Sequence, residues 1–299
     1  MIEPIFKYFE EIDSTNLEAK REGEAGAPEF TVISAGTQTA GRGRSGHTWI
    51  SPKKISVATS MLIYPEGIPM EHLPRLTIIA GVAVAEAVEE LYPLHTQIKW
   101  PNDVLIDSRK ICGILTEMEA ENGHAKQVVC GIGVNVHQKK EDFAPEIRDM
   151  ATSLDIELEK QIDANDTAGM QKAKSSNFDQ KSNPLDFEKK EQQAFETEGG
   201  SVIHLASRKA ITEAIWQHFL KHYEIFRANG GSLGGILESY NSRLANKNKR
   251  VRVVHQIHDF EGVALEMDPD GRLLIQKDDG GITAVDSGEV HVRGLYGYA

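Results

Sequence analysis

The stretch Gln38-Thr39-Ala40-Gly41-Arg42-Gly43-Arg44-Ser45-Gly46 decides how the rest of this 299-residue chain is interpreted. Its three glycines allow a tight turn and let the backbone come close to a ligand. Arg42 and Arg44 add fixed positive charge and planar forks of N–H donors, which suit phosphates and carboxylates. The pattern predicts a clamp that closes on an anion.

Dinucleotide-binding turns share this glycine spacing, but they need a strand before the loop and a helix directly after it. The strand-like run 30–34 precedes the loop, whereas residues 47–54 contain Pro52 and lack apolar residues at helical spacing. The sequence therefore argues against a dinucleotide-binding turn. A plain surface turn is the other alternative.

Composition narrows the class of protein. The net charge of −12 disfavours general affinity for nucleic acid, which depends on neutralising phosphates. Two cysteines, Cys112 and Cys130, cannot form a disulfide framework and indicate a reducing compartment. The N-terminus lacks the pattern of a signal peptide, and no apolar run is long enough to span a membrane. We expect a cytoplasmic protein.

The first half of the chain predicts an α+β fold, with a mixed β-sheet and flanking helices. An exposed edge strand near 127–136, broken by Gly131 and Gly133, would allow a second copy to pair. The expected strands are 5–9, 31–35, 55–63, 96–100, 104–106, 110–118 and 127–136, and the expected helices are a short one ending at residue 20 and a long one over 73–91.

Beyond residue 155 the composition changes twice. Residues 160–200 are too polar to form a core, and we expect a flexible or partly helical surface insertion. Helices are expected over 208–227, with an apolar stripe every four residues, and over 233–244. Short strands at 250–254, 262–265, 273–276 and 289–292 predict a small antiparallel barrel. The expected domains are 1–247 and 248–299.

A second chemically informative stretch is Lys99-Trp100-Pro101-Asn102-Asp103. It places a cation, an amide and a carboxylate at one strand end, where an isolated Lys–Asp pair would otherwise be a surface ion pair of little consequence. Lys110 follows across a predicted hairpin and is expected to approach the same pocket as Lys99. Gly131-Ile132-Gly133-Val134-Asn135 adds two glycines for close backbone approach and another amide.

Taken together, these segments resemble a biotin–protein ligase. The matching pieces are Ser14-Thr15-Asn16, the loop from Gln38 to Arg44, Trp49, Lys99 to Asp103, Lys110 to Leu115 and Gly131 to Asn135. The resemblance implies the class II synthetase-like fold shared by lipoate and biotin ligases, with a C-terminal SH3-like β-barrel. It also implies the monofunctional type without an N-terminal DNA-binding domain, because the motifs begin at Ser14.

The resemblance implies two half-reactions: biotin and ATP, with Mg²⁺, form biotinyl-5′-AMP, and biotin then passes to one lysine of a carrier domain. It implies catalytic roles for Lys110, Arg42, Arg44, Asp103 and Lys99. Biotin would contact Ser14, Thr15, Asn16, Gln38, Gly41, Arg42, Gly43, Arg44, Lys110, Gly113, Leu115, Gly131 and Val134. The nucleotide would contact Trp49, Asn102, Asn135 and Arg293. Asp103 would either position Mg²⁺ or accept a proton from the incoming lysine.

The expected partner is the biotin carboxyl carrier domain of acetyl-CoA carboxylase or a related carboxylase, with no nucleic acid or membrane and either a monomer or a homodimer. Three alternatives remain. A lipoate–protein ligase shares the fold and the adenylation chemistry, although Ser14, Thr15 and Gln38 favour a polar ureido ring over an apolar dithiolane. A non-catalytic biotin-sensing module would not need Lys99, Asp103, Lys110 and both arginines. A nicotinamide-dependent oxidoreductase is disfavoured by the missing helix.

Overall fold

The structure is a computed structural model that describes residues 2–51, 54–166, 194–196, 202–204, 206–255, 259–287 and 290–294. Most of the predicted insertion at 160–200 lies outside the described residues. Within and beside it, the structure describes the end of helix α3 (Leu154–Asp166) and a two-stranded pair, β8 (Ala194–Glu196) with β9 (Val202–His204).

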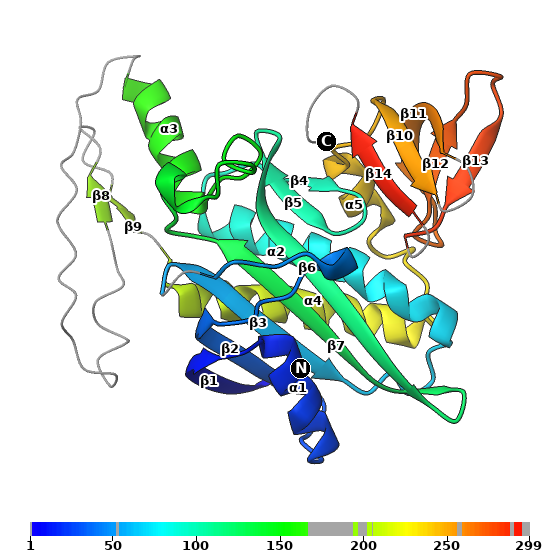
Figure 1. Cartoon of the computed structure of the whole chain (residues 1–299), viewed down its shortest axis with the longest axis horizontal. Helices are drawn as coiled ribbons and strands as arrows, with labels where there is room; N and C mark the ends of the chain where they lie inside the picture. Colours follow the sequence, from blue (N-terminus) through cyan, green and yellow to red (C-terminus); the bar gives the residue numbers. More distant parts are fainter. Residues whose placement is uncertain are drawn as a thin grey trace.

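A seven-stranded mixed sheet forms the centre of the molecule (Figure 1). Its strand order is β1-β2-β3-β7-β6-β5-β4. The β1–β2 pair is parallel and the other five pairs are antiparallel, which confirms the predicted mixed sheet. The strands are β1 (Ile5–Ile12), β2 (Thr31–Gln38), β3 (Ser56–Ile63), β4 (Gln97–Lys99), β5 (Asp103–Ile106), β6 (Arg109–Glu121) and β7 (His124–Asn135).

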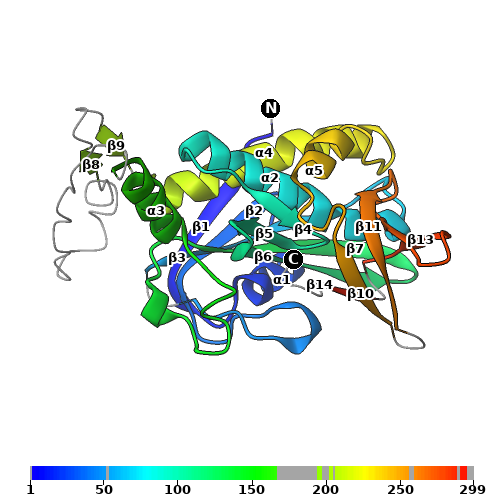
Figure 2. The same cartoon turned by 90° about the horizontal axis from the view of Figure 1, so that it is seen from above.

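Helices cover both faces of this sheet. Helices α2 (Leu76–Leu91), α4 (Arg208–Ala228) and α5 (Leu237–Arg243) lie on one face, and α1 (Thr15–Glu24) lies on the other (Figure 2). The stripe predicted on α4 is confirmed, since Ile211, Ile215, Phe219 and Tyr223 are all buried. Burying each such side chain contributes roughly 1.5–3 kcal/mol.

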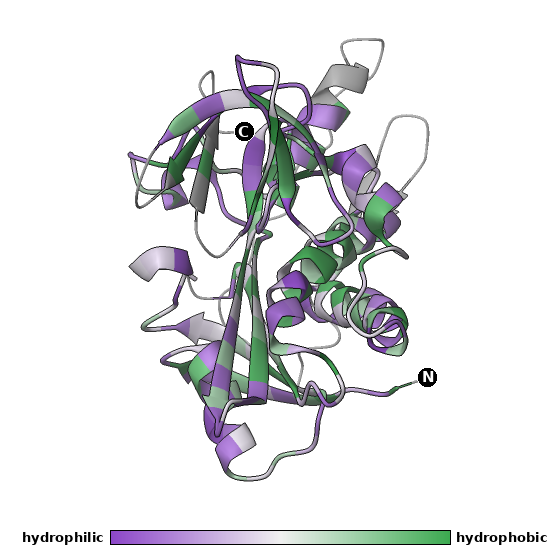
Figure 3. Cartoon of the chain, turned by 90° about the vertical axis from the view of Figure 1, so that its right-hand side faces the viewer, coloured by the Kyte–Doolittle hydropathy of each residue, from purple (hydrophilic) through white to green (hydrophobic). Residues whose placement is uncertain are grey.

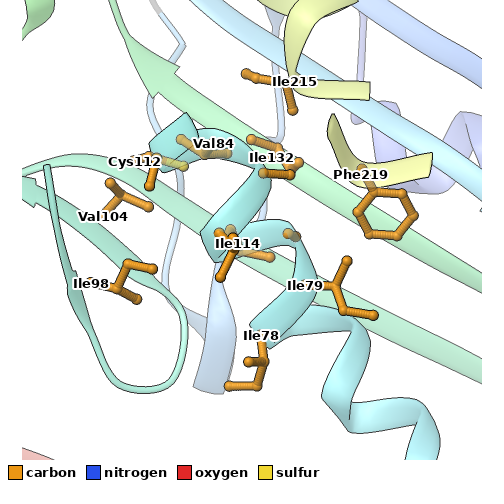
Figure 4. Packing of buried hydrophobic residues seen from close by; sticks show 14 of the residues in the cluster. Ile78, Ile79, Val84, Ile98, Val104, Cys112, Ile114, Ile132, Ile215 and Phe219 are labelled. Atoms are coloured by element: carbon orange, nitrogen blue, oxygen red, sulfur yellow. The ribbon is translucent and has the colours of Figure 1, made fainter. Parts of the chain in front are cut away.

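The main core lies between the sheet and the α2–α4 layer (Figure 4). Ile98, Val104, Cys112, Ile114 and Ile132 project from the strands toward α2 and α4. In Figure 3, the strands carry both hydrophobic and hydrophilic residues, and successive side chains along a strand point to opposite faces of the sheet. The opposite face is therefore left for α1 and for the loops that carry the glycine–arginine motif.

Four local expectations differ from the structure. Strand β7 is unbroken at its glycines and lies between β3 and β6, so it offers no edge for a second copy. The long helix starts at Leu76 rather than 73, because Pro74 disfavours helical backbone at the residue before it; Met70–Arg75 is a 3₁₀ turn instead. Helix α5 is shorter than predicted and begins after Gly234 and Gly235.

A separate antiparallel sheet at the C-terminus confirms the predicted small β unit. Its order, β13-β12-β11-β10-β14, includes one strand, β13, that was not expected. This sheet lies against the Lys99–Asp103 turn: Trp100 Nε1 donates to Gly271 O at 3.0 Å, and Arg75 pairs with Asp270 at 3.0 Å. Its strands are β10 (Arg250–His255), β11 (Phe260–Met267), β12 (Leu273–Gln276), β13 (Ile282–Val285) and β14 (Val290–Gly294). The domain boundary at 247/248 stays a prediction.

No helix among the residues that the structure describes is both long and apolar enough to cross a membrane.

Candidate active site

The glycine–arginine loop connects β2 to β3 and folds back on itself. Gly43 N donates to His47 O at 2.7 Å, and Trp49 N donates to Gly41 O at 3.0 Å. A Cβ atom at Gly41 would lie 2.2 Å from Trp49 O, so a larger residue cannot take this position without moving the backbone. The return of the chain therefore delivers Trp49 to the same place as both arginines.

The loop closes over a cavity of about 50 Å³ between it, α1, β6 and β7. Ligand pockets are usually about 300–1,000 Å³, so a ligand must displace side chains here. The residues that line this first cavity are Ser14, Thr15, Asn16, Gln38, Arg42, Gly43, Arg44, Trp49, Asn102, Lys110, Gly113, Ile114, Leu115, Gly131, Ile132 and Gly133.

Glycines on two neighbouring strands form the floor of the first cavity. Gly113 on β6 pairs with Gly133 on β7, and Leu115 pairs with Gly131, so the glycines share one face of the sheet. The Trp49 indole rests on them: a Cβ atom at Gly133 would lie 2.4 Å from Trp49 Cε2. The indole Nε1 is buried and has no hydrogen-bond partner among the residues that the structure describes. A flat group can therefore lie directly against this backbone.

Three cations line the first cavity: Arg42 and Arg44 from the glycine–arginine loop and Lys110 from β6. Arg44 Nη1 donates to Asn102 Oδ1 at 3.0 Å, and its Nη2 donates to Ser287 O of the C-terminal unit at 2.5 Å. Burial lowers the pKa of Arg44 below its ordinary value, against the opposing effect of the Asp103 charge. Lys110 Nζ pairs with Asp103 Oδ1 at 2.6 Å. This concentration of positive charge suits a ligand with several negative charges.

An uncharged polar network completes the lining. Gln38 Oε1 accepts from Thr15 N at 2.8 Å, and the Ser60 hydroxyl lies 2.7 Å from Thr15 Oγ1 and 2.6 Å from Asn16 Oδ1. Ser14 precedes α1, but its side chain makes no capping hydrogen bond. These groups offer donors and acceptors to a neutral polar ligand without adding charge.

A second cavity of about 460 Å³ adjoins the first and shares Trp49 and Lys110 with it. Asn135 lies in its wall, and Ile147 and Met150 add exposed apolar surface. Asn135 Nδ2 donates to Thr152 O at 3.0 Å, which holds the end of β7 against the segment beyond it. A ligand with two parts could therefore place one part in each cavity, with Lys110 at the boundary between the two parts.

The structure thus brings most of the predicted site residues together. Ser14, Thr15, Asn16, Gln38, Arg42, Gly43, Arg44, Trp49, Asn102, Lys110, Gly113, Leu115 and Gly131 line the first cavity. Gly41 stands beside it in contact with Trp49 and Gln38, Asp103 lies behind Lys110, and Asn135 lines the second cavity.

Two predicted residues are placed differently, and a third is described only in part. Val134 belongs to the hydrophobic core and not to the cavity wall, because strand alternation turns it away from Gly131 and Gly133. Lys99 pairs in register with Asp103 and is not among the residues that line either cavity, whereas Lys110 lines both. Of Arg293, the structure describes only the backbone in β14, opposite Arg252.

Sequence reasoning did not identify Ser60, Glu117 or Ser287. Ser60 is a fully buried serine in β3, which also contains Ser56 and Thr59, and Glu117 follows the Gly113–Leu115 run at the spacing of one strand face. The spacing of Glu117 was visible in the sequence, but the contacts of Ser60 and Glu117 with α1 were not. Ser287 approaches Arg44 from 243 residues away.

The site does not fit a resident metal ion. Among the residues that the structure describes, no group of three or more His, Cys, Asp or Glu side chains could hold one. Asp103 Oδ1 already accepts from Lys110 Nζ and from Asn102 Nδ2 at 3.1 Å. A Mg²⁺ ion that arrives with a nucleotide needs only one or two protein carboxylates, and Asp103 is the carboxylate that lies beside Lys110.

Comparison with known proteins agrees with this geometry. Residues 8–135 match the biotin/lipoate A/B protein ligase family. The chain is 43% identical to the bifunctional ligase/repressor BirA of Bacillus subtilis over 156 residues, which make up 52% of this chain and 48% of that protein. It is 36% identical to the biotin–[acetyl-CoA-carboxylase] ligase of Mycobacterium tuberculosis over 145 residues, 47% of this chain and 51% of that protein. The match thus spans about half the length of these curated relatives.

A solved structure of similar fold is the biotin protein ligase of Aquifex aeolicus in complex with biotin and ATP. It has a TM-score of 0.72 and 23% sequence identity, and the alignment covers 97% of this chain and 99% of that one. The likeness extends to the C-terminal sheet and confirms the α+β ligase fold over nearly the whole chain. Residues 8–135, the part of the chain that matches the biotin/lipoate A/B protein ligase family, contain the glycine–arginine loop, the glycine floor and Lys110.

Proposed function

We propose that this protein is an ATP-dependent biotin–protein ligase. The observation that carries the proposal is the convergence of Arg42, Arg44 and Lys110 on one cavity whose other polar lining groups are uncharged. Such a cavity suits a ligand with a neutral polar ring and an anionic tail. Biotin has this form, since it joins a ureido ring to a carboxylate.

In the first half-reaction, a biotin carboxylate oxygen attacks the α-phosphorus of ATP, and pyrophosphate leaves. The two reactants are both anions, so cations must offset their repulsion. Lys110 lines both cavities and is the residue best placed to touch the carboxylate and the α-phosphate together. Mg²⁺ bound to the triphosphate would neutralise further charge.

The adenosine part fits the second cavity. Trp49 offers an aromatic face, and Asn135 an amide, at the boundary with the first cavity. Arg42 and Arg44 then cover the acyl-phosphate link from the loop, and Arg44 is held there by Asn102 and Ser287. Exclusion of water protects this reactive mixed anhydride from hydrolysis.

In the second half-reaction, the amine of a carrier-domain lysine attacks the acyl carbon and AMP leaves. The amine must first lose a proton, because its ordinary pKa is about 10.4. Asp103 is the carboxylate nearest to Lys110 in the site, and we propose that it either receives this proton or contacts the nucleotide-bound Mg²⁺. The acceptor is a biotin carboxyl carrier domain of a carboxylase.

The test is incubation with biotin, MgATP and a carrier domain, followed by intact-mass measurement of the carrier. Covalent addition of one biotin supports the proposal. Lipoate in place of biotin, with its own carrier domain, tests the related activity of the same family, which the Thr15–Asn16–Gln38 network disfavours. Biotin binding without pyrophosphate exchange or carrier modification would instead indicate a sensing module.

A further inference from the structure

Glu117 lies behind the wall of the first cavity, and the chemistry above does not use it. It is on β6, on the same strand face as Gly113 and Leu115, and its side chain is 17% exposed. Its carboxylate contacts three groups: Asn16 Nδ2 at 2.8 Å, Lys20 Nζ at 3.1 Å and Arg42 Nη1 at 3.2 Å. Two of these groups, Asn16 and Arg42, belong to residues that line the cavity.

The first contact fixes the orientation of the Asn16 amide. Asn16 Nδ2 also lies 3.2 Å from Leu115 O, so both acceptors around this nitrogen require it to be the donor. An ionised carboxylate only accepts, and it therefore excludes the flipped amide. Asn16 Oδ1 is then directed toward Ser60 and Gly131, where a Cβ atom would lie 1.9 Å from it.

The second contact holds a cation of the loop. The Arg42 side chain is 43% exposed and pairs with Glu117. A ligand carboxylate or phosphate competes for the same guanidinium. Glu117 thus links the anion-binding loop to Asn16, and Ser60 extends this link to Thr15.

We propose that Glu117 is a positioning residue for ligand recognition. It keeps the acceptor of Asn16 available to a ligand N–H, as in the ureido ring of biotin, and gives Arg42 a defined place beside the cavity. The inference rests on the proposed function and adds to it the residue that orders the biotin-binding amide.

The experiment compares steady-state biotin-dependent ATP–pyrophosphate exchange in wild type, Glu117→Gln, Glu117→Asp and Glu119→Gln. A glutamine at 117 can present its own N–H groups to Asn16 and allows the amide to turn. We expect the KM for biotin to rise about tenfold or more in Glu117→Gln, with kcat within about twofold. The reason is that a turned Asn16 amide presents N–H to the N–H of the ligand, so the hydrogen bond is lost and both donors are desolvated without a partner. Glu117→Asp keeps the acceptor and should recover part of the affinity.

Glu119→Gln is the matched control. Glu119 is the next residue on this strand face and accepts from Gln127 Nε2 at 2.6 Å, without a described contact to the cavity. It should keep the wild-type KM and a similar melting temperature. If the wild type is active and Glu117→Gln keeps the wild-type KM for biotin, the proposed role of Glu117 is overturned and the proposed function still stands. Equal losses in both glutamine variants would also overturn it, since they would reflect a structural effect. A wild type without biotin-dependent exchange would overturn the proposed function as well.

Discussion

Removal of the Lys110 ammonium group should lower both the rate of the reaction and the free energy of unfolding, and the two effects can be measured separately. Lys110 Nζ is 2.6 Å from Asp103 Oδ1, and the two side chains are 24% and 12% exposed. Lys110→Ala takes this cation away from Asp103, which keeps the neutral donor Asn102 Nδ2 at 3.1 Å among its other partners. Because the pair is only partly buried, we expect the free energy of unfolding to fall by about 1–3 kcal/mol.

The loss of activity should be larger. A cation about 4 Å from a phosphate oxygen is worth about 4 kcal/mol at an effective dielectric constant near 20, and part of this acts in the ground state. We therefore expect biotin-dependent ATP–pyrophosphate exchange to fall by about 10²–10³-fold for Lys110→Ala. The assay is isotope exchange at saturating biotin and MgATP, with chemical denaturation of the same preparations.

Two control variants distinguish the loss of the Lys110 charge in the site from the general effect of removing an ion pair. Lys7→Ala removes an ion pair of the same length, 2.6 Å to Glu22, on the outer strand β1, and should leave exchange unchanged. The double variant Asp103→Ala/Lys110→Ala removes both partners and should recover much of the lost stability without recovering exchange. Exchange within about twofold of wild type in Lys110→Ala would remove Lys110 from the reaction and refute this reasoning.

Three further predictions concern other parts of the molecule. Arg44→Gly removes the contacts to Asn102 and Ser287 and should release biotinyl-AMP, seen as increased labelling of bystander proteins that lack a carrier domain; no increase would count against the clamp. Gly133→Ala should displace the Trp49 indole and raise the KM for ATP at least several-fold, whereas an unchanged value would argue that Trp49 does not contact the nucleotide. Burial alone would raise the pKa of Glu86. Its contacts with His222 and His218 on α4 instead lower this pKa from an ordinary 4.5 to about 2. Its stabilisation is therefore complete above about pH 4.5 and is lost as pH falls toward 2, so Glu86→Gln should flatten the denaturation profile in that window; an equally steep profile would contradict the assignment.

The fold was largely accessible from the sequence because its signals are local. Apolar residues four apart predicted α4, and strand-like runs between glycines and prolines predicted most of the sheet. The predictions from sequence were wrong where the position of a strand depends on pairing with distant segments of the chain. Whether residues 124–135 form an edge or a central strand depends on β3 and β6, which lie on either side, and a single strand does not encode its neighbours.

For the candidate site too, the sequence predicted some lining residues correctly and others incorrectly. Residues of one motif came to the cavity together, as Arg42, Gly43 and Arg44 show. Lys99 does not line it, although it lies in the same motif as Asn102, which does. The period of two along a strand explains why Gly131 lines the cavity and Val134 does not, but only the structure shows which face the cavity is on.

The sequence by itself determined the chemistry that is available: a flexible, doubly cationic loop, lysine and carboxylate side chains near a hairpin, and glycines at strand positions that permit close approach. Tertiary structure decided which of these groups meet. Glu117 reaches Asn16 across 101 residues, and Arg44 reaches Ser287 across 243. The reason is that strand pairing and helix docking depend on burial and register between distant segments, whereas a motif records only what neighbours along the chain can do.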